Sequence, residues 1–138
     1  MIRFFTENIS FRLTNKKIIR KWLMDVVEAE NKRTGNINFI FCPDDYLLEI
    51  NKQYLNHDYF TDVITFDYSD GTELSGDIFV SIDSVRVNSI KYKQIFEKEL
   101  YRVMVHGILH LCLYKDSTIQ EITVMHSKEN HYLEKIAI

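Results

Sequence analysis

Apolar residues recur at two spacings along the chain, and the helical spacing dominates. In the first half, apolar positions three and four residues apart predict an amphipathic helix over about Asn15–Glu30. Thr14 fits the N-cap of that helix, and Gly35 fits the turn after it. A second apolar stripe follows Pro43, which suits a helix start, and ends before the turn-forming residues Asn56–Asp58. The first half is therefore predicted to contain two helices.

The second half carries three more helical segments. Asp83 fits the cap of a short helix that runs through Asn88. Ile95–Leu113 has apolar residues on most sides of one long helix, which is typical of a buried element. A last helix is predicted over about Ile119–Ile136. We therefore expect Ile95–Leu113 to be the central helix of the fold.

Four short segments favour strand because they alternate or are rich in β-branched and aromatic residues. They are Ile2–Phe5, Asn36–Cys42, Asp62–Tyr68 and Asp77–Ile82. The last two are separated by a turn-forming stretch and are predicted to pair in antiparallel fashion. The chain reads as one α+β domain over residues 1–138, a sandwich with a small mixed sheet of about four strands.

Composition narrows the class of protein without naming a function. The chain has 138 residues, 46% of them hydrophobic and 27% charged, which suits one globular domain. A net charge of −3 gives no overall electrostatic footprint for nucleic acid, and the basic cluster Lys16–Lys21 reads as a solvated helix face. No apolar run approaches the roughly 18 residues of a membrane span. No secretion signal is recognisable, so we expect a cytoplasmic protein without a membrane partner. Cys42 and Cys112 lack a C-x-x-C spacing and read as reduced core residues.

The strongest chemical signal is a pair of histidines on the predicted central helix. His106 and His110 are four residues apart, so both imidazoles leave the same helix face. Asp116 follows the expected helix end and can supply a third donor, with His126, His131 and the distant His57 as other candidates. Three protein ligands with an open fourth position are the layout of a catalytic zinc site. The competing interpretation is a pair of buried neutral histidines, with Asp116 as a helix cap.

Gly107 restricts the chemistry of such a site. Zinc peptidases of the H-E-x-x-H type carry their general base beside the first histidine, where this chain has Gly107. A peptidase is therefore disfavoured. Glycine inside a helix costs about 1 kcal/mol relative to alanine, which indicates a close approach by another backbone or by a substrate.

Several motifs together resemble the YbeY family, the bacterial single-strand-specific endoribonucleases of ribosomal RNA maturation and ribosome quality control. The segment HGILHLCLYKD is similar to the family signature His-Gly-x-Leu-His-Leu-x-Gly-Tyr-Asp-His. Three further blocks keep the order and spacing of the family's motifs. The matching positions in those blocks are Asn51, Tyr54, Thr61, Asp62, Val63, Phe66, Gly76, Asp77, Ile78 and Ser81.

The chain departs from the family pattern at four positions. Asp116 stands where the family has its third histidine, Lys115 where it has aspartate, and Leu113 where it has glycine. An aspartate still binds zinc, whereas leucine suits Leu113 poorly if the backbone there needs a positive φ. Leu55 replaces an arginine that the family ties to RNA cleavage. Lys52 and Arg102 are the candidates to compensate for the missing cation.

The resemblance implies a metal-dependent endoribonuclease that processes ribosomal RNA, including the 3′ end of 16S RNA. Its expected cofactor is one Zn²⁺ per chain, or another divalent ion such as Ni²⁺, held by His106, His110 and Asp116. Its expected partners are single-stranded or ribosomal RNA and the small ribosomal subunit, with a basic rim on the cleft. The catalytic residues are unknown, and Glu121 and Asp62 are candidates for a general base.

Three alternatives stay open. The chain could be a non-catalytic, ribosome-associated RNA-binding factor with a structural metal, as the substitutions at Leu55 and Leu113 suggest. It could also be a metallohydrolase of another substrate, such as a peptide. Thr61, Asp62 and Asp77 also have a purely structural interpretation, in which they cap turns and strand ends.

Overall fold

A computed structural model describes residues 1–137 of the chain. In chain order the elements are β1 (Ile2–Thr6), α1 (Lys16–Ala29), β2 (Arg33–Cys42), α2 (Asp44–Leu55), β3 (Val63–Asp67), β4 (Glu73–Ser81), α3 (Ile82–Lys91), α4 (Phe96–Leu111) and α5 (Ile119–Leu133). This is the α+β arrangement predicted from the sequence, including the mixed sheet and its four strands.

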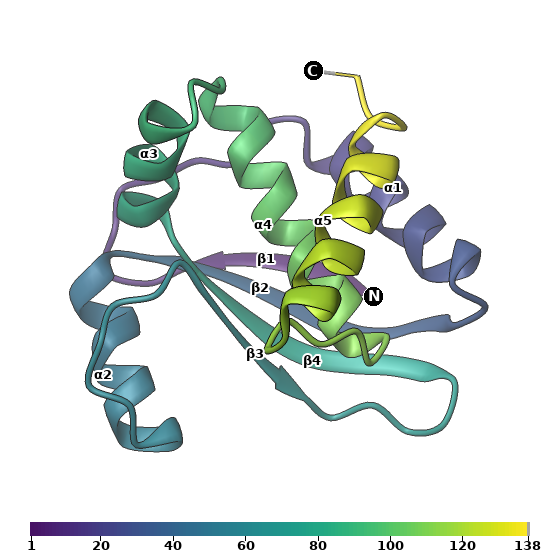
Figure 1. The fold of residues 1–138 in the computed structure, drawn as a ribbon, viewed down its shortest axis with the longest axis horizontal. Helices are drawn as coiled ribbons and strands as arrows, with labels where there is room; N and C mark the ends of the chain where they lie inside the picture. The colour runs from purple at the N-terminus through teal and green to yellow at the C-terminus, as the bar shows by residue number, and fades with distance from the viewer. Residues whose placement is uncertain (138) are drawn as a thin grey trace.

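The strands form one sheet in the order β1-β2-β4-β3. β1, β2 and β4 are parallel, and β3 pairs with β4 in antiparallel fashion, with Val63 opposite Val80 and Asp67 opposite Gly76. In Figure 1, α1, α3, α4 and α5 lie on one side of the sheet and α2 lies on the other. The main core lies between the sheet and α1, α4 and α5, and a smaller cluster around Leu47 and Ile64 lies under α2.

The central position of α4 follows from its sequence. Ten of its residues are buried, so it can be covered on most sides, as its apolar pattern predicts. Gly107 lies where α4 meets β4, and a Cβ atom there would come within 2.7 Å of Ile78 Cγ2. The close approach expected at Gly107 is therefore made by the side chain of Ile78 on β4. Neither another backbone nor a substrate is the reason for the glycine.

Several predicted element boundaries are wrong, for local reasons. The N-cap of α1 is Asn15, at φ 60°, and Thr14 does not cap the helix. Gly35 lies inside β2, where a Cβ atom would come within 2.6 Å of the Leu74 carbonyl oxygen. α3 is capped by Ser81, whose side chain accepts a hydrogen bond from the Ser84 amide, and Asp83 lies in the first turn.

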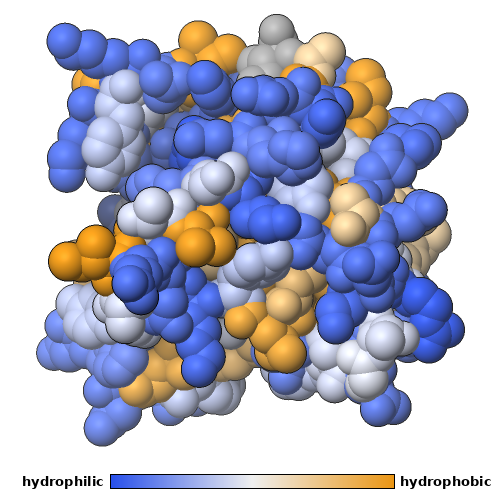
Figure 2. Space-filling view, turned by 45° about the vertical axis from the view of Figure 1, so that its right-hand side comes forward, coloured by the Kyte–Doolittle hydropathy of each residue, from blue (hydrophilic) through white to orange (hydrophobic). Residues whose placement is uncertain are grey.

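Two expectations about surface and cysteines can also be compared with the structure. Cys42 and Cys112 are both free, and burial raises the pKa of each thiol to about 12. Within residues 1–137, no helix combines the length and apolar character needed to cross a membrane. The face of the molecule in Figure 2 is mainly hydrophilic, with hydrophobic side chains in small separate groups.

Candidate metal centre

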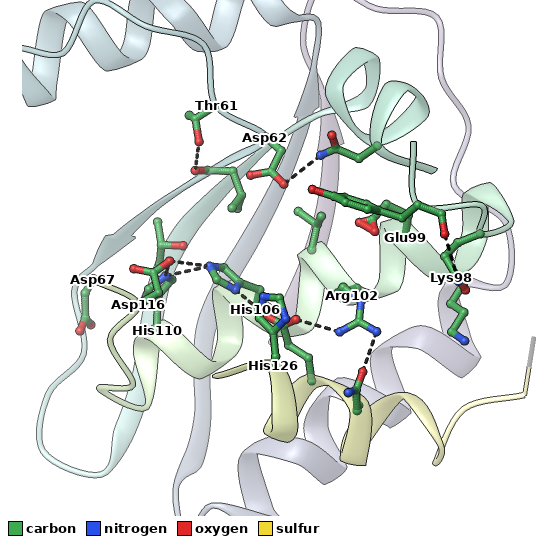
Figure 3. Close-up of a pocket in the computed structure, with 18 residues that line it drawn as sticks. Thr61, Asp62, Asp67, Lys98, Glu99, Arg102, His106, His110, Asp116 and His126 are labelled. Atoms are coloured by element: carbon green, nitrogen blue, oxygen red, sulfur yellow. Dashed lines mark hydrogen bonds and ion pairs between the residues drawn. The ribbon is translucent and has the colours of Figure 1, made fainter. Parts of the chain in front are cut away.

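The three donors predicted from the sequence converge at one point. His106 and His110 come from the last two turns of α4, and Asp116 comes from the loop before α5. The Nε2 atoms of the two histidines are 2.9 Å apart. Asp116 Oδ2 lies 3.3 Å from Nε2 of His106 and 3.4 Å from Nε2 of His110. Figure 3 shows the three side chains turned toward one another at one end of a cleft.

This triangle has the dimensions of a tetrahedral zinc site. Zinc bonds of about 2.0–2.1 Å to nitrogen and carboxylate oxygen place ligand atoms roughly 3.3–3.4 Å from one another. Two sides of the observed triangle match this value, and the third is slightly shorter. All three residues line the cleft, so an ion held by them would be open to a substrate.

The outer nitrogen atoms of both histidines have partners that determine where the protons lie. His110 Nδ1 is 2.9 Å from the carbonyl oxygen of Tyr114, which can only accept a hydrogen bond. His106 Nδ1 is 2.6 Å from Glu129 Oε2. With a proton on each Nδ1, both neutral imidazoles direct an Nε2 lone pair at the other and at the Asp116 carboxylate. Three acceptors facing one another need a cation or an extra proton between them, so these residues fit a metal ion.

Electrostatics around His106 agree with this arrangement. Burial is the largest single influence and lowers the pKa of His106, whereas the hydrogen bond and negative charge of Glu129 raise it. The charges of Asp116 and Asp62 act in the same direction, so the pKa is raised overall. The surroundings of His106 therefore favour positive charge, which a proton or a metal ion can supply.

The loop that carries Asp116 starts with a residue in the left-handed region. The Leu113 amide donates to His110 O and the Tyr114 amide to Leu109 O, the hydrogen bonds of a Schellman motif at the end of α4. Leu113 occupies its C′ position at φ 73°, with its side chain 73% exposed. This position therefore does need a positive φ, which explains why glycine suits it and shows that leucine has been accommodated there.

Glu129 is the functional residue that the sequence analysis missed. It lies on α5, is only 2% exposed, and accepts from Arg102 Nη1 at 2.9 Å as well as from His106. Its neighbours on the buried face of α5 are Met125, Tyr132 and Leu133. A glutamate among apolar residues at helical spacing was the available signal, because buried carboxylates require partners.

The other histidine candidates lie apart from the three donors. His126 lines the cleft but is not part of the group whose ligand atoms converge. His57 stacks on Tyr59 just after α2, and His131 packs edge-on against Tyr132. Neither His57 nor His131 lines the cleft.

The cleft has a volume of about 900 Å³ and extends from the three donors to the start of α4. Its lining includes five carboxylates and two cations. The carboxylates are Asp62, Asp67, Glu99, Asp116 and Glu129, and the cations are Lys98 and Arg102. The lining therefore lacks the basic surplus that we expected of the rim. Of the two candidates to replace the missing arginine, Arg102 lies in the cleft, whereas Lys52 lies outside it near Glu49 and Asp58.

The two candidate bases have different surroundings. Glu121 belongs to the capping box of α5, where its carboxylate accepts from the amides of Ser117 and Thr118. Asp62 lies in the cleft just before β3, and Asn88 Nδ2 donates to its Oδ2 at 3.4 Å. Burial raises the pKa of Asp62. Asp77, by contrast, accepts from Asn38 between neighbouring strands, which is a structural role.

A cleft with three converging donors on an α+β frame defines a class of candidate metal-dependent enzymes, and comparison with known proteins identifies the family. A model of the family described as endoribonuclease YbeY matches residues 2–137. The chain belongs to the endoribonuclease YbeY family.

Individual relatives agree with this assignment. The endoribonuclease YbeY of Azobacteroides pseudotrichonymphae is 47% identical over 135 residues, covering 98% of this chain and 97% of the relative. That of Flavobacterium psychrophilum is 51% identical over 130 residues, covering 94% of this chain and 93% of the relative. The solution structure of TM1509 from Thermotoga maritima aligns with a TM-score of 0.67 at 30% identity, covering 98% of this chain and 88% of that one.

Proposed function

We propose that residues 1–138 form a single metal-dependent endoribonuclease domain that cleaves single-stranded RNA. The observation that carries this proposal is the convergence of His106 Nε2, His110 Nε2 and Asp116 Oδ2, with the Nδ1 atom of each histidine bonded elsewhere. Membership in the endoribonuclease YbeY family supports RNA as the substrate. Zinc suits this set of two imidazoles and one carboxylate, and Ni²⁺ is the other candidate.

When bound, the ion would lower the pKa of a coordinated water and stabilise negative charge on a phosphoryl oxygen. The protein's own contribution is positional. Glu129 and the Tyr114 carbonyl hold the two imidazoles with their Nε2 atoms toward the ion. Asp62 is the general-base candidate that lies in the cleft, and burial raises its pKa, which makes the carboxylate a stronger base than an exposed aspartate. Arg102 is positioned to meet a phosphate, although Glu129 and Asn130 already accept from it.

We further propose a biological setting for this activity. The substrate is ribosomal RNA, including the 3′ end of 16S RNA, and the partner is the small ribosomal subunit, in maturation and quality control in the cytoplasm. This setting is supported by the similarity to proteins named endoribonuclease YbeY.

One observation favours a second candidate, a non-catalytic ribosome-associated RNA-binding factor with a structural metal. Leu55, the last residue of α2, is 39% exposed and stands where the family motif has arginine. The cation of the family motif, which would bind a phosphate, is therefore missing from the end of α2.

Metal content and RNA cleavage of the same preparations distinguish the two candidates. We expect one zinc ion per chain in the wild type, loss of zinc in His110→Ala and Asp116→Ala, and loss of cleavage in both variants. His126→Ala is the matched control, because His126 lines the same cleft outside the donor group and should keep its metal. Cyclic-phosphate ends would identify the RNA 2′-hydroxyl as the nucleophile.

Two outcomes contradict the enzymatic proposal. RNA cleavage that survives treatment with EDTA would exclude metal dependence. Full rescue of a deletion strain by His110→Ala would favour the binding factor, because maturation would then not require the metal site.

A further inference from the structure

The cleft contains a second buried glutamate, about two helical turns from His106, whose carboxylate has no hydrogen-bond partner among residues 1–137. Glu99 lies in the first turn of α4 and is only 5% exposed. Its backbone amide donates to Ile95 O, but its carboxylate makes no hydrogen bond or ion pair with any of residues 1–137, and the residue lines the cleft. Figure 3 shows it in the cleft beyond Arg102, away from His106 and Asp116.

The carboxylate meets only the solvent of the cleft, because its oxygens are not among the fully enclosed polar atoms of residues 1–137 that lack a partner. Burying a charged group without hydrogen bonds is unfavourable by several kcal/mol in typical proteins. The helix N-terminus offsets part of this cost through its dipole, but within the described part of the chain no amide or side chain donates to the Glu99 carboxylate. Burial raises the pKa of Glu99, the charge of Arg102 lowers it, and the charges of Asp62 and Glu129 raise it, so that the pKa is raised overall.

The groups around Glu99 are those that recognise a planar, polar ligand. Asp62 lines the opposite wall, just before β3, with Asn88 bonded to it from α3. Tyr92, which precedes α4, also lines the cleft and is 54% exposed. Lys91 Nζ lies 5.4 Å from the centroid of its ring, so a base would have to stack on the other face or displace the lysine. Single-stranded RNA is read in this way, by stacking on aromatic rings and hydrogen bonds to the Watson–Crick edge of an unpaired base.

We propose that Glu99 is the centre of a nucleobase subsite, in which its carboxylate accepts N–H donors from the edge of an unpaired RNA base. Guanine fits best, because its N1–H and N2 amino group are adjacent donors that match the two carboxylate oxygens. Uracil fits least well because it lacks an exocyclic amino group. This subsite rests on the proposed RNA-cleaving function and adds a base preference to it.

The spacing between the subsite and the metal donors suits one nucleotide. Seven residues of α-helix separate Glu99 from His106, which corresponds to about 10 Å along the axis. That length is comparable to the reach of a nucleotide from its phosphate to the far edge of its base. A phosphate at the donors would thus place the attached base beside Glu99.

The test measures binding without cleavage. The zinc-loaded protein is titrated with 2′-O-methyl uridine hexanucleotides that carry a single guanine, adenine or cytosine. We expect the guanine-containing strand to bind about tenfold more tightly than all-uridine, the scale of one bidentate base contact. Glu99→Gln should abolish that preference, because its amide replaces one acceptor by a donor. Glu97→Gln is the matched control, a change of the same kind at an exposed residue of the same helical turn that should keep the preference.

Each other outcome has a defined meaning. Equal binding of all four strands by the wild type, or a guanine preference that persists in Glu99→Gln, overturns the subsite. A second zinc ion per chain that Glu99→Gln removes also overturns it, since the carboxylates would then hold a cation. A Glu99-dependent preference without any cleavage of ordinary RNA would keep the subsite and refute the nuclease. Cleavage of ordinary RNA without any base preference would keep the nuclease and refute the subsite.

Discussion

The two ends of the cleft each contain a buried glutamate, and the two glutamates differ in whether protein groups bind their carboxylates. Glu129, at the metal end, is 2% exposed and accepts hydrogen bonds from His106 and Arg102. Glu99, at the start of α4, is 5% exposed, and its carboxylate has no partner among residues 1–137. Both residues are thus largely buried, but the carboxylate of Glu129 is held by protein donors, whereas that of Glu99 meets only the solvent of the cleft.

This difference separates a structural role from a ligand-binding role. A satisfied buried carboxylate strengthens the packing between its helices, because removing it leaves its partners without acceptors. An unsatisfied one weakens the fold and is tolerated where a ligand completes it. Substituting the two glutamates should therefore change stability in opposite directions.

The largest effect is expected at Glu129. Glu129→Ala leaves Arg102 Nη1 and the His106 Nδ1 proton without their acceptor, although Arg102 Nη2 keeps Asn130, and should cost about 3 kcal/mol of unfolding free energy. Zinc affinity should also fall by about 10- to 100-fold, because the His106 ring loses its orienting bond. Denaturant unfolding of the metal-free protein and competition with a chelator measure these two quantities separately.

Glu134→Ala is the control for this prediction. Glu134 is an exposed carboxylate at the end of the same helix, so its loss should change neither quantity appreciably. Unchanged zinc affinity in Glu129→Ala would show that His106 is oriented by packing alone.

A smaller effect of opposite sign is expected at Glu99. Glu99→Gln removes an unpaired buried charge and should raise the unfolding free energy by about 1 kcal/mol at neutral pH. Burial is the largest influence on this carboxyl; it raises the pKa, Arg102 lowers it, and Asp62 and Glu129 raise it. The net pKa lies above the ordinary value of 4.5.

The pH dependence follows from that direction. Above pH 4.5 the unfolded chain releases the Glu99 proton while the folded chain retains it, so this group lowers stability as pH rises to its folded pKa. The advantage of Glu99→Gln should therefore be absent below the ordinary pKa and grow as the pH rises. Parallel unfolding curves of the two proteins at every pH would contradict an unpaired carboxylate.

The sequence was most informative where one helix determined the geometry. The four-residue spacing of His106 and His110 follows from helical periodicity, so their convergence could be predicted with Asp116 nearby. The central, buried position of α4 could be predicted equally well, since its apolar residues extend around most of its surface. The requirement for a positive φ at Leu113 could be inferred from the glycine in the family motif.

Features that depend on two distant elements were not predictable in this way. Glu129 reaches His106 only because α5 packs on α4, and no local pattern gives that pairing. Gly35 reads as a turn residue, but its role is close contact with β4. The unpaired state of Glu99 is a property of the surrounding fold, because it depends on which donors fail to reach it.

The smallest effect concerns the turns at the two ends of α4. A Schellman motif closes α3 with Lys93 at φ 55°, and another closes α4 with Leu113 at φ 73°. Left-handed backbone costs a residue with a side chain roughly 1–2 kcal/mol, and the greater freedom of unfolded glycine offsets part of this. Leu113→Gly and Lys93→Gly should therefore each gain about 0.5–1 kcal/mol in denaturant unfolding, since both side chains are exposed. Zinc affinity should be unchanged in both, because backbone hydrogen bonds form the turn that leads to Asp116. A loss of stability in Leu113→Gly alone would show that leucine packs usefully at the metal end, where glycine is the family's residue.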